Sequence, residues 1–241
     1  MPMYFWGELC GTAMLIFLGN GVVAGALLKA SYGHAAGWLA ITAGWAFAVM
    51  AGVFTALSIG SNAHLNPAVT VGAAIAAGNW SRVAPYIVAQ VLGAMLGALL
   101  VWLHYLPHWR ETEDAAVKLA CFCTSPAIRN TRSNLLSEVL GTFVLVLVAQ
   151  AISSGRVASN GPAPALAPLL VGCLVWGIGL SLGGTTGYAI NPARDLGPRL
   201  MHALLPIAGK GGSHWDYAGI PIIGPLLGAS LAGLLVRALA I

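Results

Sequence analysis

Two copies of the tripeptide Asn-Pro-Ala are the residues of this sequence whose types and spacing most clearly suggest chemistry. They are Asn66, Pro67, Ala68 and Asn191, Pro192, Ala193. Asn favours the N-cap of a helix, and Pro is tolerated at the first helical position because it has no N–H to leave unpaired. Each tripeptide therefore predicts a helix start at which the Asn oxygen caps the helix and the Asn NH2 group points away as a donor.

Arg194 follows the second tripeptide directly, and no charged residue precedes it as far back as Val157. A guanidinium in apolar surroundings costs about a few kcal/mol or more, so it needs a partner or a function. One interpretation pairs it with a carboxylate. The interpretation that we favour directs its forked donors at a ligand.

The other ionisable residues give no sign of catalysis. His64 has no second metal ligand at suitable spacing, so we expect a hydrogen-bonded structural role for it. Cys121 and Cys123 are too close together for a usual zinc pair and are expected to be packing residues. No nucleophile stands with a His and a carboxylate as an enzyme would need. We therefore expect no enzyme, no metal and no cofactor.

The composition shows which elements must position these residues. Hydrophobic residues make up 58% of the 241 residues and charged residues only 7%, against about 25% charged in a soluble domain. So few charges cannot cover a soluble protein of this length. The net charge of +4 forms no basic cluster, which argues against nucleic-acid binding. The chain is predicted to lie in a lipid bilayer.

Six charge-poor stretches are long enough to cross the hydrocarbon core as helices, which takes about 20 residues. Continuous apolar runs exclude a β-barrel, whose strands alternate. The first run is expected to be retained, because the N-terminus lacks a basic leader. The predicted spans are Tyr4–Leu28, Trp38–Ile59, Val83–Leu103, Leu135–Ile152, Ala163–Leu182 and Tyr217–Leu239.

Two apolar pieces are too short to span the bilayer. Asn66–Ala77 and Asn191–Ala203 each open on one Asn-Pro-Ala tripeptide and each follow a full-length apolar run. Ordinary helix caps would explain either one alone. As a pair they indicate re-entrant half-helices.

The second half of the chain repeats the first in the same order. Glu8–Thr12 returns as Glu138–Thr142, Leu65–Ala68 as Ile190–Ala193, and Val91–Val101 as Leu226–Val236. Each half holds three spans and one half-helix, and an odd number of crossings inverts the second half relative to the first. We predict one domain over residues 1–241, with repeats at about 1–125 and 126–241, whose half-helices meet near the membrane midplane.

This combination resembles the aquaporin superfamily over essentially the whole chain. Asn191–Asp195 is similar to the second motif of glycerol facilitators, in which Asp follows the Arg, and Gly219–Ile222 is similar to the sixth span of glycerol channels. The resemblance implies an all-α membrane channel with one pore in each subunit of a homotetramer. It also implies passive passage of glycerol, water and other small neutral solutes such as urea, with protons and ions excluded.

The resemblance implies a selectivity filter of Trp45, Gly179, Tyr188 and Arg194, assigned by their distances from the two motifs. Trp45 lies one residue further from Asn66 than expected, so an extra residue is placed in the loop around residues 58–62. Tyr188 departs from the Phe of well-known glycerol channels. Arg194 is expected to donate to adjacent hydroxyls of a polyol, while Trp45 and Tyr188 face its C–H side.

Further residues are expected to shape the pore. The segments before the half-helices should be non-helical, with their carbonyls directed at the wet pore: Asn62, Ala63, His64, Leu65, Gly187, Tyr188, Ala189 and Ile190. Glu8 and Glu138 occupy equivalent places in the repeats and are expected to anchor these segments. Asp195 is expected to pair with Arg199 at i,i+4.

Two alternatives remain open at this stage. A water-selective channel would carry His in place of Gly179. A proton-coupled secondary transporter would use Glu8 and Glu138 to carry protons through an inverted repeat. Flux that responds to a proton gradient would favour the transporter, and flux that follows only the solute gradient would favour the channel.

The orientation is ambiguous from charge alone. The resemblance implies a multi-pass protein of the plasma (inner) membrane with both termini in the cytoplasm. Basic residues in the loops then lie mainly outside, against the positive-inside rule. The outer ones would be Lys29, Arg110, Lys118, Arg129, Arg132 and Lys210, and the inner ones Arg82, Arg156 and Arg237.

Overall fold

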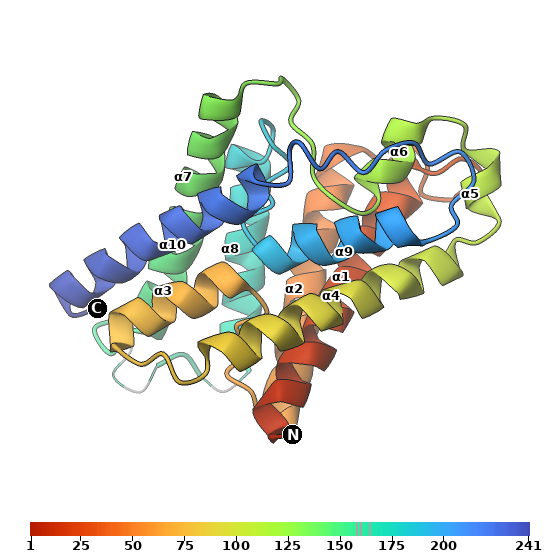
Figure 1. Cartoon of the computed structure of the whole chain (residues 1–241). Coiled ribbons are helices and arrows are strands. Elements are labelled where there is room, and N and C mark those ends of the chain that lie inside the picture. The colour runs from red at the N-terminus through yellow and green to blue at the C-terminus, as the bar shows by residue number, and fades with distance from the viewer. Residues whose placement is uncertain (158, 160, 164) are drawn as a thin grey trace.

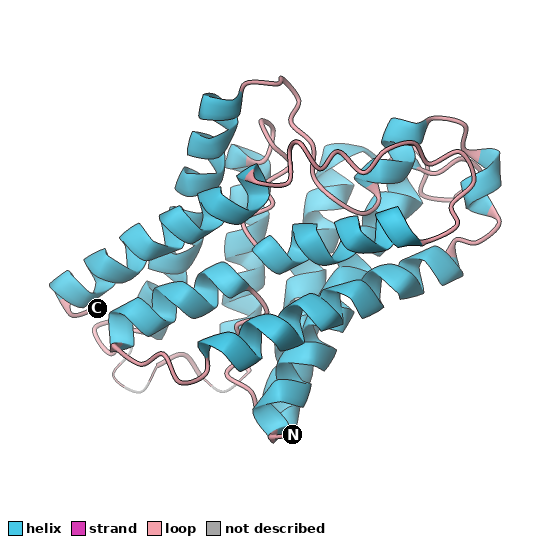
Figure 2. Cartoon of the chain, viewed as in Figure 1, coloured by secondary structure: helices cyan, strands magenta, loops and turns pink. Residues whose placement is uncertain are grey.

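The computed structural model describes residues 1–157, 159, 161–163 and 165–241. In this part of the chain all regular secondary structure is helical (Figure 2). Five helices are long and apolar enough to cross a membrane. They are α1 (Met3–Leu27), α2 (Gly37–Ile59), α4 (Val83–His104), α7 (Thr131–Ser153) and α10 (Ile220–Leu239).

The fifth predicted span is shorter than expected. Helix α8 runs over Leu166–Leu182, which is 17 residues, and begins three residues after the predicted start at Ala163. Tyr217, the predicted start of the last span, lies in a turn before α10. In both cases the apolar run extends into the loop, so the hydrophobic pattern places the helix start too early.

The two half-helices are present at the predicted places. Helix α3 (Pro67–Ala77) has 11 residues and α9 (Pro192–Leu204) has 13. Two short helices, α5 (His108–Glu111) and α6 (Ala115–Ala120), lie in the long connection between α4 and α7.

The packing of the helices follows the inverted repeat. Helix α1 packs against α2 and α4, and its counterpart α7 packs against α8 and α10. Each half-helix lies against the last span of the other half, α3 beside α10 and α9 beside α4 (Figure 1). The two repeats are therefore interlocked, and α3 and α9 point their N-termini at one another across the middle of the molecule.

Glycines allow the equivalent helix pairs to approach closely. A Cβ atom at Gly97 of α4 would lie 2.8 Å from the Cβ of Ile16 on α1. In the second repeat, a Cβ at Gly224 of α10 would lie 2.6 Å from the Cβ of Glu138 on α7. Contacts this short leave no room for a side chain, as in close helix packing within membranes.

The outward faces of the long helices are strongly apolar. Large side chains recur at i,i+3 or i,i+4 spacing and are exposed: Val88, Leu92, Leu96 and Leu100 on α4, and Ile223, Leu227, Leu231 and Leu234 on α10. Rows of this size are rare on a soluble monomer and suit contact with lipid or with further membrane-embedded chains.

Candidate functional site

The two Asn-Pro-Ala tripeptides begin α3 and α9 in the same way. Asn66 and Asn191 have extended backbones at the N-cap, with φ of −157° and −153°, and a Pro follows each at the first helical position. The Asn66 Oδ1 atom accepts from Ala68 N at 2.8 Å, and Asn191 Oδ1 accepts from Ala193 N at 3.0 Å. The local sequence thus caps each half-helix with its own Asn.

Each Asn amide also crosses to the other repeat. Asn66 Nδ2 donates to Ile190 O, and Asn191 Nδ2 donates to Leu65 O, both at 2.8 Å. The sequence predicts that each NH2 group points into the pore, whereas the structure uses one N–H of each to join the half-helices. One N–H per amide is left to face the pore.

The segments before the half-helices are irregular and conformationally strained. Four of their non-glycine residues have positive φ: Ala63 at 56°, Leu65 at 52°, Tyr188 at 37° and Ile190 at 42°. Such residues cost about 1–3 kcal/mol each and persist only where surrounding contacts hold them. Both segments must therefore be held from outside.

Buried carboxylates provide that support. Glu8 accepts from His64 N at 2.9 Å and Leu65 N at 2.7 Å, and Glu138 accepts from Ala189 N at 3.0 Å and Ile190 N at 2.8 Å. Side-chain donors complete both sets: Ser61 and Gln90 for Glu8, and Thr186 for Glu138. Glu8 and Glu138 are 0% and 1% exposed, so they serve as fixed acceptors within the fold.

A cavity of about 330 Å³ runs past the joint of the two half-helices. Its lining includes Trp45, Tyr188 and Arg194 at one end and Gln150 and Ser153 at the other, with both Asn residues between them. Seven of the eight residues predicted to contribute carbonyls line it: Asn62, Ala63, His64, Leu65, Tyr188, Ala189 and Ile190. The eighth, Gly187, lies outside the lining.

His64 is held on the cavity wall by neutral contacts. Its Nδ1 atom lies 3.1 Å from Thr70 Oγ1, and its ring meets the ring of Tyr86 edge-on at 5.1 Å. These partners are those of a hydrogen-bonded structural histidine.

Three of the four residues assigned to the filter, Trp45, Tyr188 and Arg194, line one end of the cavity, whereas Gly179 lies outside the lining, against the Tyr188 ring. The Cζ atom of Arg194 lies 4.1 Å from the centre of the Trp45 ring. Gly179 faces the Tyr188 ring, and a Cβ at Gly179 would lie 2.9 Å from Tyr188 Cζ. The missing side chain is therefore what makes room for the tyrosine. The guanidinium stacks directly on the indole, and Tyr188 lines the cavity beside them; we call this cluster of Trp45, Tyr188 and Arg194 the constriction.

Arg194 and Arg199 lie on the same half-helix but are used differently. Arg199 is fully buried and donates to both Asp195 oxygens and to the carbonyls of Thr124, Ser213 and His214. A guanidinium has five N–H donors, and within the described residues the side chain of Arg194 makes one hydrogen bond, from Nη1 to Phe122 O at 3.3 Å. Most N–H donors of the Arg194 fork therefore have no partner among the described residues.

Sequence reasoning missed the segment that covers this end of the cavity. Phe122 contributes only a carbonyl oxygen, which any residue type would supply, so no side-chain signal marks it. Thr124 donates its N–H and its hydroxyl to Asp195 Oδ2 at 2.8 and 2.7 Å. Burial raises the pKa of the nearby Cys121 thiol, which keeps it protonated and inert.

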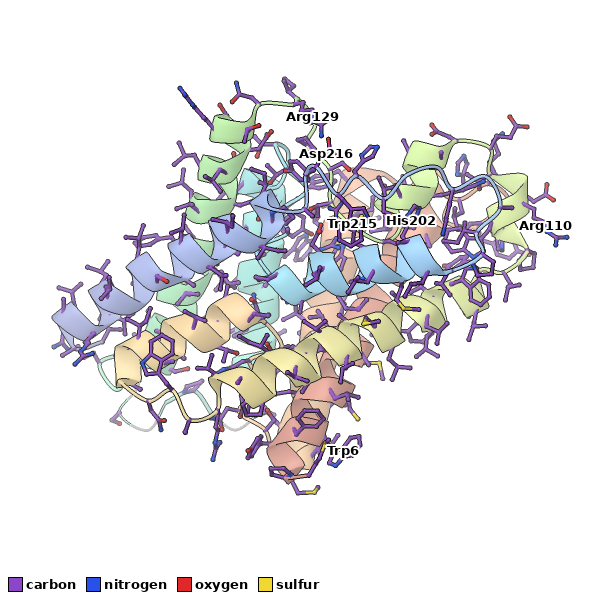
Figure 3. All side chains as sticks on the ribbon, viewed as in Figure 1. Trp6, Arg110, Arg129, His202, Trp215 and Asp216 are labelled. Atoms are coloured by element: carbon purple, nitrogen blue, oxygen red, sulfur yellow. The ribbon has the colours of Figure 1, made fainter. Side chains whose placement is uncertain are left out.

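An exposed ion pair ties the same region to the loop before α10. Arg129 and Asp216 lie next to one another at the surface (Figure 3). The hydrogen bond from Arg129 lowers the pKa of Asp216. Since the two side chains are 62% and 61% exposed, this pair is expected to contribute little to stability.

Comparison with known proteins relates this geometry to a family. The sequence model of the major intrinsic protein family matches residues 4–236 of the chain. The chain is 55% identical over 232 residues to the "Probable glycerol uptake facilitator protein" of Thermotoga maritima, covering 96% of each chain. It is 51% identical over 235 residues to the "Glycerol uptake facilitator protein" of Bacillus subtilis, covering 97% of this chain and 84% of that one.

A solved structure has the same fold. The aquaglyceroporin from Plasmodium falciparum superimposes with a TM-score of 0.86 at 25% sequence identity, over 99% of this chain and 96% of that one. The likeness in fold thus extends over essentially the whole chain, including both half-helices.

Proposed function

The chain belongs to the major intrinsic protein family, and on that premise we propose that it is a passive channel for glycerol and other small uncharged solutes. It also passes water and excludes protons and ions. The observation that carries the proposal is the constriction, where Arg194, with N–H donors left free among the described residues, stacks on the Trp45 ring beside Tyr188 in the wall of the cavity. A polyol has hydroxyl groups that can accept hydrogen bonds from Arg194 and C–H groups that can pack against the aromatic rings.

Exclusion of ions follows from two groups of positive charge along the cavity. Arg194 places a full charge at the constriction. Helices α3 and α9 meet with their N-termini together, and each N-terminus carries about half an elementary charge. The free N–H of Asn66 and of Asn191 each donates to a passing oxygen, which prevents the hydrogen-bonded chain that proton transfer needs.

The protein is a homotetramer with one pore in each subunit, and residues 1–241 form one channel domain. Urea is among its solutes. The apolar rows on α4 and α10 supply surface for lipid and neighbouring subunits.

We also propose that the protein lies in the inner membrane with both termini in the cytoplasm. Three of the six basic residues on the opposite side are used within the fold. Lys118 donates to Ala208 O, Lys210 donates to three carbonyls at the end of α9, and Arg129 pairs with Asp216. The positive-inside rule still counts these three residues, so the proposed orientation rests on family membership and not on charge.

The proposal is tested by light scattering from proteoliposomes under separate glycerol and sorbitol gradients. Vesicles with the protein should shrink under sorbitol and then, under glycerol, shrink and swell back as the solute enters. Water flux without glycerol entry would overturn the proposal in favour of a water-selective channel. Glycerol entry that changes with an imposed proton gradient would favour a coupled transporter.

The double substitution Gly179→His with Trp45→Phe is expected to lower glycerol permeability by about tenfold relative to water. An imidazole at residue 179 displaces Tyr188 towards the lumen, since even a Cβ there lies 3.0 Å from Thr42 Cγ2 and closer to Tyr188. A pocket that loses the volume of a few heavy atoms favours a smaller solute over a larger one, here water over glycerol, by about this factor. Stopped-flow measurements of both fluxes give the ratio.

The matched control is Gly177→Ala on the same helix. A Cβ at Gly177 has open space around it, so this variant should keep the wild-type ratio. An unchanged ratio in the double variant, with normal amounts of protein in the vesicles, would place the filter elsewhere.

A further inference from the structure

Two consecutive residues of α1, Gly19 and Asn20, lie directly behind the constriction without lining the cavity. Gly19 faces the Trp45 ring so closely that a Cβ there would lie 2.6 Å from Trp45 Cη2 and closer still to two other ring atoms. The indole of Trp45 therefore occupies the space that a side chain at residue 19 would need. The ring can hold its place beside Arg194 only because this residue is glycine.

Asn20 supports Arg194 of the constriction through a shared acceptor. Its Nδ2 atom donates to Phe122 O at 3.2 Å, and the same oxygen accepts from Arg194 Nη1 at 3.3 Å. A carbonyl oxygen has two lone pairs, so these donors together use its full capacity. This is the one hydrogen bond that the Arg194 side chain makes within the described part of the protein, so the Phe122 carbonyl, together with the Trp45 ring on which the guanidinium stacks, positions the guanidinium.

The oxygen of the Asn20 amide gains no partner in the described part of the fold, so only the Nδ2 donor favours Asn at this position. Asn20 is 1% exposed, and its Oδ1 atom has no hydrogen-bond partner among the residues that the structure describes. A buried acceptor without a partner is destabilising. Leu at this position would fill a similar volume without that cost, and Phe122 O would still have Arg194 as a donor. What Leu cannot supply is the Nδ2 donor.

We propose that Gly19 and Asn20 are positioning residues of the selectivity filter, Gly19 for Trp45 and Asn20, through the Phe122 carbonyl, for Arg194. This inference rests on the proposed role of the constriction as the filter. It assigns the geometry of Trp45 and Arg194 in the filter to one turn of α1.

The first test is Asn20→Leu, assayed in proteoliposomes for glycerol and water permeability and in detergent for thermal stability. The ratio of glycerol to water permeability should fall about fivefold, the change that corresponds to the loss of one hydrogen bond of about 1 kcal/mol. The midpoint of thermal unfolding should stay the same or rise. The split between selectivity and stability separates a positioning role from a merely structural one.

Thr12→Val is the matched control for this test. Thr12 is a fully buried residue of the same helix, and its hydroxyl also lacks a partner within the described residues. Among the described residues its hydroxyl makes no hydrogen bond to Phe122, so its removal should leave the permeability ratio unchanged. A wild-type ratio in Asn20→Leu, or an equal fall in Thr12→Val, would overturn the inference for Asn20.

The second test is Gly19→Ala, alone and combined with Trp45→Phe. The added methyl group should push the indole into the constriction and lower glycerol permeability more than water permeability. The smaller ring of Trp45→Phe should restore part of the loss, which a general folding defect would not show. Failure of this rescue would overturn the inference for Gly19. A wild-type protein that passes no glycerol would instead overturn the proposed function itself.

Discussion

Arg194→Val is expected to raise cation leak through the channel while glycerol still passes. Two unit charges 4 Å apart repel one another by about 4 kcal/mol at an effective dielectric constant of about 20. Removing the guanidinium therefore lowers the energy barrier to a cation at the constriction, and the rate at which cations cross this point should rise about a thousandfold. The total leak should stay small because the N-termini of α3 and α9 form a second barrier. Currents in planar bilayers, recorded beside glycerol uptake, measure both effects.

Two further variants separate the barriers. Arg194→Lys keeps the charge but loses the fork, so it should keep ions out while its preference for glycerol falls. The triple variant that also replaces Asn66 and Asn191 should leak much more than Arg194→Val. If it leaks no more, the central barrier is not real. If Arg194→Val leaks no more than wild type, Arg194 acts only in binding solute.

Asp195→Asn is expected to destabilise the protein by about 3–5 kcal/mol, because it leaves the buried Arg199 charge without its partner. The Asp195 and Arg199 side chains are both 0% exposed, and Arg199 Nε lies 2.7 Å from Asp195 Oδ1. The substitution also weakens the hold on Thr124 and thus on the segment over the constriction. Thermal unfolding followed by size-exclusion chromatography in detergent measures the loss.

The exposed pair of the same protein is the control for this experiment. Asp216→Asn removes a carboxylate whose partner, Arg129, lies in water, so unfolding should change little. Equal losses in the two variants would show that burial is not what makes the Asp195–Arg199 pair important. An undiminished midpoint in Asp195→Asn would mean that Arg199 is satisfied by carbonyl groups alone.

The fold could be predicted closely because bilayer thickness and charge fix the helix limits. The predicted spans agree with the helices within four residues at each end, and the inverted packing is confirmed. The short helices α5 and α6 were not foreseen, since each is stabilised by contacts that are distant in sequence. Trp109 of α5 is 2% exposed, and Lys118 of α6 donates to Ala208 O.

The site could be predicted where the type of side chain determines the contact. The resemblance to the aquaporin superfamily implies Trp45, Gly179, Tyr188 and Arg194, placed by their distances from the two motifs, and their roles stay predictions. Gln90 was missed although it carries a signal, since a polar residue in an apolar span needs a partner, which here is Glu8. The sequence carries no signal for the Phe122 carbonyl or for the hydrogen bonds from Asn66 and Asn191 to the other repeat, because these depend on backbone conformation and on contacts between repeats.

The crossed packing of the half-helices also bears on how the chain is made. During translation α3 is synthesised long before α10, the helix against which it lies. Asn66 cannot form its hydrogen bond until Ile190, in the second half of the chain, has been synthesised. Early in biosynthesis α3 is therefore an apolar segment too short to cross the bilayer and without its final neighbour. Assembly of the conduit is consequently a late event, completed only after the last helix has left the ribosome and entered the membrane.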